Sequence, residues 1–495
     1  MTASRSFLAI DLGAESGRAI LGTLREAHLE LSEIHRFANR PARLPDGLHW
    51  DALQLWSEIK TAIALGAHNR RDLAGIGIDT WGVDFALLDQ LGSLISNPYH
   101  YRDDRTEGML AEAFARIPRE RLFRTTGNQF MPINTLYQLL AMVLNKSPQL
   151  DMAQTLLMMP DLFNYWLTRR IASEFTIATT TQCHDPQAED WAWSLMAELG
   201  IPTRIFHQII RPGTLLAKLA PEVAEELRIA PVAVVVPASH DTGSAVAAVP
   251  AETTDFAWIS SGTWSIMGTN VQEAVLSTQA MTYNFTNEGG VFDTWRLSRN
   301  LTGLWLIQEC RRAWADQGEE MSYDELTHHA SRADGFAGFI DPDDDSFSKP
   351  GEMPTKIRAY CSRTNQRTPD SPGAMVRCAL ESLALKYRWV LERLEEIDGR
   401  HLDAVHIVGG GSRNSLLNQF TANATQRPIA AGPIEATAIG NILMQAVGLG
   451  EISSFGEARS IVRKSFTPGH YEPKEKAAWD DAYGRFLQVL GNALA

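Results

Sequence analysis

A strand–turn–strand pattern occurs twice in this chain, and it limits the possible folds more than any other feature of the sequence. The apolar run FLAID at 7–11 leads through a glycine-bearing turn into a second strand-like stretch at 18–24. The run FAWIS at 256–260 leads in the same way through the turn SGT at 261–263 into WSIMG. Short apolar runs joined by such turns are typical of β-hairpins. Their recurrence about 250 residues apart predicts two related halves.

Strand patterns alternate with helical patterns along the rest of the chain. The predicted strands span 75–79, 232–236 and 404–408, and the predicted helices span 136–144, 376–394, 416–424 and 474–490. This alternation indicates an α/β protein in which helices cover sheets. A polar segment after Pro250 separates two apolar blocks. The predicted domains are therefore residues 1–248 and 249–495.

The net charge is negative and spread along the chain, with 45 Lys and Arg against 59 Asp and Glu. Proteins that follow a phosphate backbone need a concentrated basic face, so nucleic acid is not an expected partner. The longest apolar run, 229–238, is about half the length of a membrane-spanning helix, and no export signal is visible. The four cysteines form no CxxC pair, which is typical of buried thiols in a reducing cytoplasm.

The turn at 11–18 combines a carboxylate at the end of a strand with two glycines. Backbone N–H groups in such a turn can approach an anion, while Asp11 can face a metal ion. An ordinary hairpin turn explains the same residues, so this segment leaves both interpretations open. The turn at 261–263 carries the same two interpretations with a weaker signal.

Two polar segments directly follow predicted strands, where α/β sheets present catalytic groups. Asp241 ends the most apolar strand and is a candidate general base for a substrate hydroxyl, although a helix N-cap is an equally good interpretation. Trp81, Gly82 and Asp84 offer an aromatic plane, an approachable backbone and a carboxylate, which together suit a sugar. Trp81 as a plain core residue fits the sequence equally well.

Three glycines at 409–411 follow a predicted strand and precede a predicted helix, an order typical of nucleotide sites. The dinucleotide pattern GxGxxG is incomplete because Asn414 stands at its last position, and no acidic residue ends a second strand about 20 residues later. A nicotinamide-dependent dehydrogenase is therefore disfavoured. Two interpretations stay open: a ribose or a flat ring could pack against the glycine backbone, or the glycines could form only the turn that enters the helix.

Taken in order, the motifs of the chain resemble those of the FGGY family of carbohydrate kinases. The resemblance runs from about residue 7 to about residue 466 and is carried by FLAIDLGAESGR, GIDTWGVDF, YRDDR, GNQF, MMPDLFNYWLT, ATTTQ, ASHDTGSA, ISSGTWSIMG, NEGG, RNLTGLW and HIVGGGSRNSLLNQFTANATQRPIAAGPIEATAIGN. It implies an α/β fold of the actin-like ATPase (ribonuclease H-like) type, with two related domains around a central cleft. Sugar would bind mainly to the first domain and ATP to the second.

The resemblance also implies roles for individual residues. Asp241 would take the proton from the sugar 1-hydroxyl and, with Asp11, would hold Mg²⁺. The residues that would contact the sugar are Gly82, Asp84, His240, Asp241, Thr242 and Asn300. The residues that would contact ATP are Ala14, Glu15, Ser16, Gly17, Arg18, Thr263, Gln308 and Gly410. Glu15 stands where some members have Ser, and its carboxylate would repel phosphates unless it points outward or toward Mg²⁺.

The resemblance also implies the activity, which is ATP-dependent, Mg²⁺-dependent phosphorylation of L-rhamnulose at the 1-hydroxyl, in L-rhamnose catabolism. The expected enzyme is a cytoplasmic monomer or homodimer with no membrane or nucleic-acid partner. Within the family, L-fuculose, D-xylulose or a similar ketose is the alternative substrate. Outside it, an actin-like nucleotide switch or a non-catalytic sugar sensor would keep the ATP turns but would need no base, and Asp241 beside His240 argues against both.

Overall fold

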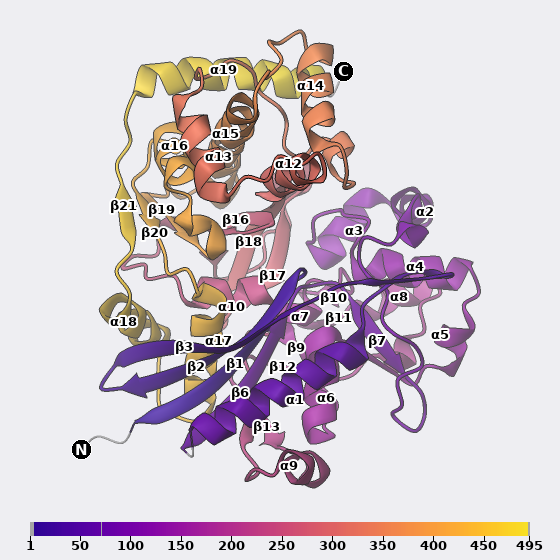
Figure 1. The fold of residues 1–495 in the computed structure, drawn as a ribbon. Coiled ribbons are helices and arrows are strands. Elements are labelled where there is room, and N and C mark those ends of the chain that lie inside the picture. Colours follow the sequence, from indigo (N-terminus) through magenta and orange to yellow (C-terminus); the bar gives the residue numbers. More distant parts are fainter. Residues whose placement is uncertain (1–3, 71, 494–495) are drawn as a thin grey trace. The chain divides into compact units, whose positions relative to one another are not determined.

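The computed structural model describes residues 4–70 and 72–493, which fold as two compact units (Figure 1). The first unit contains the segment that ends at Pro250, together with Asn270–Leu297 and Ala436–Phe466. The second unit contains Ala251–Thr269, Ser298–Glu435 and the segment that begins at Thr467. The predicted domains divide the sequence once, near residue 248, whereas the two units interleave along the chain.

The first unit is built on a six-stranded sheet of order β13-β14-β6-β1-β2-β3 (Figure 1). Its strands are β1 (Arg5–Leu12), β2 (Ser16–Arg25), β3 (His28–Ala38), β6 (Leu73–Thr80), β13 (Thr214–Lys218) and β14 (Ala233–Val236). The strand β2 runs antiparallel to both of its neighbours, β1 and β3, while β6 is parallel to both β1 and β14. The register pairs Asp11 with Asp79, so the carboxyl ends of β1 and β6 meet at one edge of the sheet.

Six strands of the seven-stranded second sheet repeat this arrangement, in the order β18-β16-β15-β19-β20-β21. Its strands are β15 (Phe256–Ser261), β16 (Trp264–Val271), β18 (Trp295–Thr302), β19 (Ala404–Val408), β20 (Ile429–Ala431) and β21 (Gly469–Tyr471). The strands β15 and β16 are antiparallel, β15, β19 and β20 are parallel, and the edge strand β21 is antiparallel. The predicted two related halves are therefore confirmed.

Helices cover the first sheet through residues that alternate along its strands. Leu8 and Ile10 of β1 pack with Leu55 and Ile59 of α1 (Ala52–Asn69) and with α6 (Met159–Thr168). The helix α17 (Ala436–Gly448) packs on the same sheet and against α10 (Asp241–Ala247). On β6, a Cβ at Gly77 would lie 2.8 Å from Gln445 Nε2 of α17, so side chains of α17 pack directly on this strand. Close packing on the first sheet thus explains why the segment from residue 436 belongs to the first unit.

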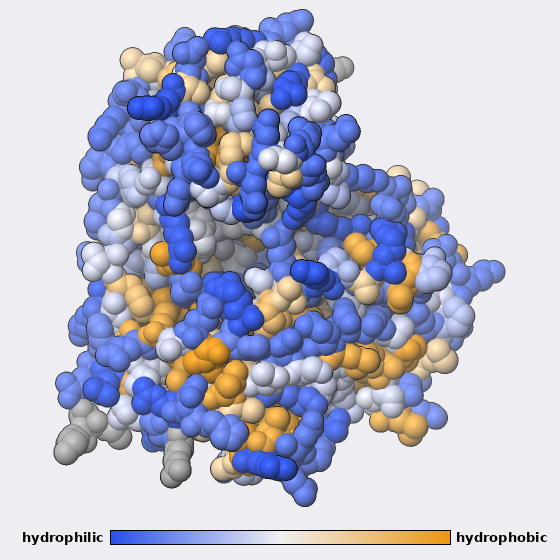
Figure 2. All heavy atoms as spheres, in the orientation of Figure 1, coloured by the Kyte–Doolittle hydropathy of each residue, from blue (hydrophilic) through white to orange (hydrophobic). Residues whose placement is uncertain are grey.

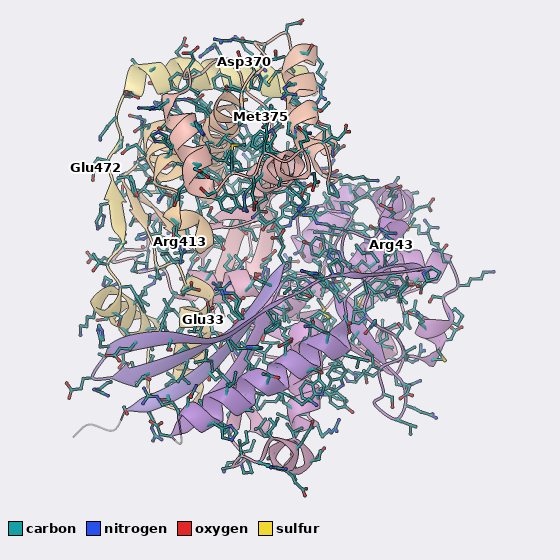
Figure 3. The ribbon with its side chains drawn as sticks, in the orientation of Figure 1. Glu33, Arg43, Asp370, Met375, Arg413 and Glu472 are labelled. Atoms are coloured by element: carbon teal, nitrogen blue, oxygen red, sulfur yellow. The ribbon has the colours of Figure 1, made fainter. Side chains whose placement is uncertain are left out.

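The second unit has a helical layer that includes α12 (Trp305–Asp316), α13 (Tyr323–Arg332), α14 (Met353–Arg363), α15 (Pro372–Asp398), α16 (Ser415–Thr425) and α19 (Lys476–Ala493). The long helix α15 begins where Ser371 Oγ accepts the Ala374 N–H and ends at Gly399, whose φ is 75°. Met375, labelled in Figure 3, lies fully buried in this layer. The helices predicted in this unit and α4 (Thr135–Leu144) of the first unit are all present.

The described residues also form further helices and strands. They are β4 (Ala42–Leu44), β5 (Gly47–His49), β7 (Phe85–Leu88), α2 (Met109–Arg116), α3 (Arg119–Thr126), α5 (Pro148–Met152), β8 (Thr155–Met158), β9 (Ser173–Glu174), α7 (Phe175–Ala178), β10 (His184–Asp185), β11 (Asp190–Trp191), α8 (Trp193–Glu198), β12 (Ile209–Ile210), α9 (Pro221–Leu227), α11 (Thr278–Thr282), β17 (Thr286–Gly289) and α18 (Phe455–Ser465).

The visible surface is largely polar, and the cysteines are buried. Most residues on the face shown in Figure 2 are hydrophilic, with apolar residues scattered among them. Within residues 4–70 and 72–493, no helix has the length and apolar character needed to cross a membrane. Cys183, Cys310, Cys361 and Cys378 are all free and buried, as predicted.

Candidate active site

Asp241 lies at the carboxyl edge of the first sheet, where β14 ends and α10 begins. The chain at His240 continues the sheet as a parallel bridge to Thr80, and the Thr80 N–H donates to the Ser239 carbonyl at 2.9 Å. Asp241 is the first residue of α10, and its side chain is 31% exposed. The N-cap position belongs to His240, so the N-cap interpretation of Asp241 is wrong by one residue. Its Oδ1 nevertheless accepts from the Thr242 N–H and, at 3.1 Å, from Thr242 Oγ1.

Three carboxylates influence one another at this edge of the sheet. Burial raises the pKa of Asp241, and the nearby charge of Asp11 adds to this rise, although His240 opposes it. Burial and the charge of Asp11 hold the pKa of Asp79 well above its usual range. Arg18 Nε and a terminal guanidinium nitrogen lie 2.9 Å and 2.8 Å from Asp11 Oδ2. The edge therefore concentrates negative charge beside one arginine.

His240 joins Asp241 to a buried ion-pair cluster. Its Nε2 lies 3.4 Å from Asp241 Oδ1, and its Nδ1 lies 3.2 Å from Glu288 Oε2. Arg296 Nη2 lies 3.1 Å from both His240 Nδ1 and Glu288 Oε2, and the Arg296 side chain is fully buried. Although burial alone would raise it, the pKa of Glu288 is lowered because Arg296 and His240 stabilise its charge. The cluster fixes the imidazole ring beside Asp241.

A second buried carboxylate holds the backbone that leads into Asp241. Glu174 Oε2 accepts the N–H groups of Ser239 and Ile177, both at 3.1 Å. Thr176 Oγ1 donates to Glu174 at 2.6 Å and accepts the His240 N–H at 3.1 Å. Burial raises the pKa of Glu174 to about 7. The segment before Asp241 is thus fixed by side chains from β9 and α7.

The predicted phosphate turn is the hairpin between β1 and β2. The Gly13 N–H donates to the Ser16 carbonyl at 3.0 Å, and Asn39 Nδ2 donates to the Gly13 carbonyl at 2.8 Å. Gly17 is buried against the Phe37 ring, whereas Ala14, Ser16 and Arg18 are half-buried. Glu15 is the exposed residue of the turn.

The predicted sugar segment follows β6. Trp81 is 5% exposed and its ring centroid lies 4.0 Å from that of Trp50, so the core interpretation of Trp81 is right. Gly82 is half-buried, whereas Asp84 is fully buried and accepts hydrogen bonds from both tryptophan indoles. Thr242 is buried in α10. These residues belong to the first unit, while Asn300 lies in the second unit on β18.

The predicted ATP residues of the second unit gather around two adjoining turns. A Cβ at Gly411 would lie 2.7 Å from Ser261 Cβ, so the glycine turn packs directly on the turn at 261–263. The Trp305 N–H donates to the Thr263 carbonyl at 3.1 Å and joins the same turn to α12. Gln308 of α12 has a buried side-chain oxygen without a hydrogen-bond partner. A Cβ at Gly410 would meet nothing within 4 Å, so its backbone is approachable.

Four polar residues of this site escaped the sequence analysis. Asp79 and Glu288 lie within the quoted motifs GIDTWGVDF and NEGG, and the position of Asp79 at a strand end was a usable signal. Arg296 and Glu174 had no local signal, because their roles depend on contacts with residues distant in sequence.

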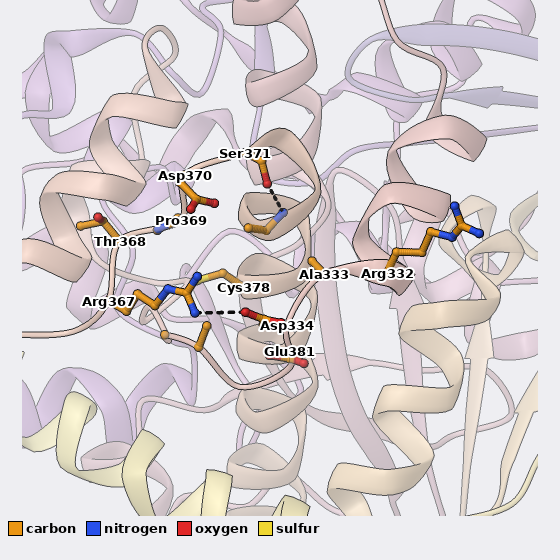
Figure 4. A pocket seen from close by; sticks show the side chains of 13 residues that line it. Arg332, Ala333, Asp334, Arg367, Thr368, Pro369, Asp370, Ser371, Cys378 and Glu381 are labelled. Carbon is orange, nitrogen blue, oxygen red and sulfur yellow. Dashed lines mark hydrogen bonds and ion pairs between the residues drawn. The ribbon is translucent and has the colours of Figure 1, made fainter.

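A separate pocket of about 200 Å³ lies in the second unit near the start of α15 (Figure 4). Two of its lining charges pair with each other, since Arg367 lies 3.1 Å from Asp334, and Glu381 accepts at 2.7 Å from Arg377, which lies outside the lining. None of the predicted site residues lines it.

In a comparison with known proteins, the profiles of one family match nearly the whole chain. The profiles of the N-terminal and C-terminal domains of the FGGY family of carbohydrate kinases match residues 6–248 and 257–449. A rhamnulokinase of Bacteroides thetaiotaomicron is 43% identical over 98% of this chain and 99% of its own length. A rhamnulokinase of Oceanobacillus iheyensis is 40% identical over 93% of this chain and 96% of its own length.

Solved structures share the fold at low sequence identity. A gluconate kinase from Lactobacillus acidophilus superposes with a TM-score of 0.83 at 15% identity, covering 100% of this chain and 99% of its own. A Plasmodium falciparum glycerol kinase with ADP superposes with a TM-score of 0.78 at 16% identity, covering 99% of this chain and 98% of its own. The fold predicted from the sequence is thereby confirmed as the two-domain α/β fold of sugar kinases.

Proposed function

The chain belongs to the FGGY family of carbohydrate kinases, and we propose that it transfers the γ-phosphoryl group of ATP to the 1-hydroxyl of L-rhamnulose in L-rhamnose catabolism. The observation that carries the proposal is the partly exposed carboxylate of Asp241 at the sheet edge, with His240 beside it. The relatives at 40–43% identity, both named rhamnulokinase, favour L-rhamnulose over L-fuculose or D-xylulose.

In the proposed reaction, Asp241 accepts the proton of the sugar 1-hydroxyl. The hydroxyl oxygen forms a bond to the γ-phosphorus while the bond from that phosphorus to the bridging oxygen of ADP breaks. A raised pKa makes the Asp241 carboxylate a stronger base. His240, fixed by Glu288 and Arg296, would contact the sugar beside Asp241. Gly82, Thr242 and Asn300 are the further proposed sugar contacts.

We propose that ATP contacts the β1–β2 turn at Ala14–Arg18, together with Thr263, Gln308 and Gly410. The backbone N–H groups of a tight turn suit phosphate oxygens. The unpartnered oxygen of Gln308 and the open space at Gly410 support contacts to the nucleotide. Glu15 is the exposed residue of this turn, and we propose no contact of its carboxylate with the phosphates.

The residues at the sheet edge fit a magnesium ion. Mg²⁺ prefers hard oxygen ligands and is commonly held by one or two carboxylates together with waters and phosphate oxygens. The charge of Asp11 raises the pKa of both Asp79 and Asp241, and the charge of Asp241 also raises that of Asp79, so a cation near these carboxylates would relieve their repulsion. Asp11 and Asp241 are the residues that would hold Mg²⁺. When bound, it would neutralise charge on the triphosphate. We further propose a cytoplasmic monomer or homodimer whose partners are small molecules.

The test compares Asp241→Asn with the wild type in an assay of sugar-dependent ADP release. Loss of a positioned general base typically costs about two orders of magnitude or more in turnover, so we expect at least that fall, with sugar binding largely kept. Asp151→Asn, at an exposed carboxylate of α5, is the matched control and should leave turnover unchanged. Unchanged turnover in Asp241→Asn would contradict its role as the base. ATP hydrolysis that ignores sugar would instead favour a nucleotide switch.

A further inference from the structure

We propose that Asp84 is a positioning residue, which holds the turn Trp81–Asp84 in a strained shape for sugar binding without touching the sugar itself. The proposal rests on the proposed function for the identity of the sugar. Its basis is the geometry of the carboxylate and of the turn that it closes. It replaces the direct Asp84–sugar contact that the family resemblance implied.

The hydrogen-bonding capacity of the Asp84 carboxylate is already used within the first unit. Its Oδ2 accepts from Trp50 Nε1 at 2.6 Å, from Trp81 Nε1 at 3.0 Å and from the Tyr101 N–H at 3.1 Å. Its Oδ1 accepts from Gln138 Nε2 at 2.9 Å. A carboxylate offers about four acceptor positions, and the side chain is fully buried. A sugar hydroxyl could reach it only by displacing one of these donors.

The turn before Asp84 is strained at Val83. The Asp84 N–H donates to the Gly82 carbonyl at 2.9 Å, which closes a three-residue γ-turn with Val83 at its centre. Val83 has a φ of 67°. The positive-φ γ-turn is rare, and this backbone region is especially unfavourable for a β-branched residue. Strained backbone persists where the surroundings over-determine it, and it is concentrated at functional sites.

Neighbouring side chains hold Val83 on both sides. Its N–H donates to Thr180 Oγ1 at 3.1 Å, and its carbonyl accepts from Thr135 Oγ1 at 2.6 Å. Gln138 links the centre of the turn to its last residue, because its Nε2 lies 3.3 Å from the Val83 carbonyl and 2.9 Å from Asp84 Oδ1. The Asp84 carboxylate therefore anchors the frame of hydrogen bonds with Thr135, Gln138 and Thr180 that keeps the strained turn closed.

The same frame places the residue that the family resemblance assigns to the sugar. A Cβ at Gly82 would lie 3.2 Å from Thr180, so the backbone here passes close to the α7 side of the unit. If the hold on Asp84 weakened, Val83 would relax toward negative φ and Gly82 would move with it. The predicted consequence is a loss of sugar affinity with little effect on ATP.

The first experiment measures both KM values, turnover and the unfolding midpoint of full-length Asp84→Asn. Asparagine keeps the shape but replaces one acceptor oxygen by an NH₂ group that faces donors. Losing a hydrogen bond to a charged group is equivalent to about tenfold or more in affinity, so we expect the sugar KM to rise about tenfold and the ATP KM to stay within about twofold. Glu381→Gln is the matched control, because Glu381 is a buried carboxylate of the second unit that accepts from Arg377 and the Phe336 N–H. It should lower the unfolding midpoint without moving the sugar KM.

A rescue variant separates positioning from general destabilisation. Val83→Gly accepts positive φ without strain, so it should lower the sugar KM of Asp84→Asn back toward the wild-type value. It should also raise the unfolding midpoint of Asp84→Asn by more than it raises that of the wild type. Thr180→Val, which removes the acceptor of the Val83 N–H at nearly constant volume, serves if Asp84→Asn fails to fold and should raise the sugar KM alone.

An unchanged sugar KM in Asp84→Asn, or the absence of rescue by Val83→Gly, would overturn the positioning role. The sugar KM is measured with the ketose that the wild type phosphorylates best, so a different preferred ketose would revise the proposed substrate and leave this test intact. If the wild type phosphorylates no ketose, the proposed function fails. The unfolding midpoints of the single and double variants at positions 83 and 84 can be measured without sugar. A larger effect of Val83→Gly on Asp84→Asn than on the wild type then decides the role of Asp84.

Discussion

Replacing Gly440 by alanine tests the packing that holds α10, the helix that begins at Asp241. Gly440 of α17 faces Ser244 of α10, and a Cβ there would lie 2.6 Å from the Ser244 carbonyl carbon and closer still to its oxygen. The obstructing atoms are backbone, so no side chain can rotate away and the two helices would have to separate by on the order of 1 Å. Overpacking of this kind costs about 1–3 kcal/mol, and we expect the upper part of that range.

Because α10 begins at Asp241, the same displacement should impair catalysis. A misplacement of about 1 Å can cost about a hundredfold in rate. Urea unfolding and sugar-dependent turnover would be measured for Gly440→Ala beside Gly456→Ala in α18, where a Cβ meets nothing within 4 Å. Gly456→Ala should match the wild type in both assays. If Gly440→Ala is as stable and as active as Gly456→Ala, the inferred contact between α10 and α17 is wrong.

Two further predictions concern buried carboxylates. Burial raises the pKa of Asp84 from 3.8 to about 6, so the folded protein binds this proton more tightly than the unfolded chain. Below pH 3.8 this tighter proton binding makes its whole contribution to the free energy of unfolding. The contribution is lost as the pH rises through about 6, a change of about 3 kcal/mol. Urea unfolding between pH 4 and 7 should show the advantage of wild type over Asp84→Asn shrinking by about that amount, whereas a constant difference would contradict it. Glu288→Gln should cost about 3 kcal/mol or more in urea unfolding, because fully buried Arg296 would lose its carboxylate partner. Wild-type stability in Glu288→Gln would show that the ion pair does not stabilise the fold.

Local patterns were sufficient to predict most of the fold. The hairpins at 7–24 and 256–268 follow from apolar runs and turn residues, and the long helix α15 follows from Ser371 and Gly399 at its ends. Asp241 was found because a polar residue after a buried strand lies at the sheet edge. Such signals depend only on neighbours in the sequence.

Contacts between distant segments could not be predicted in this way. Asp84 has the pattern of an accessible sugar ligand, yet Trp50 and Gln138, which are far from it in sequence, enclose it. Arg296 lies in an ordinary strand pattern and becomes part of the site only through His240. The return of residues 436–466 to the first unit depends on the packing of α17 against β1 and β6, which no local periodicity records.

The most direct test of the account is the catalytic efficiency of sugar-dependent ADP release with Mg-ATP for L-rhamnulose, L-fuculose, D-xylulose, L-ribulose and glycerol. We expect the highest kcat/KM for L-rhamnulose. A higher value for another substrate would contradict L-rhamnulose as the substrate, and ADP release that does not depend on any of these sugars would contradict the kinase itself.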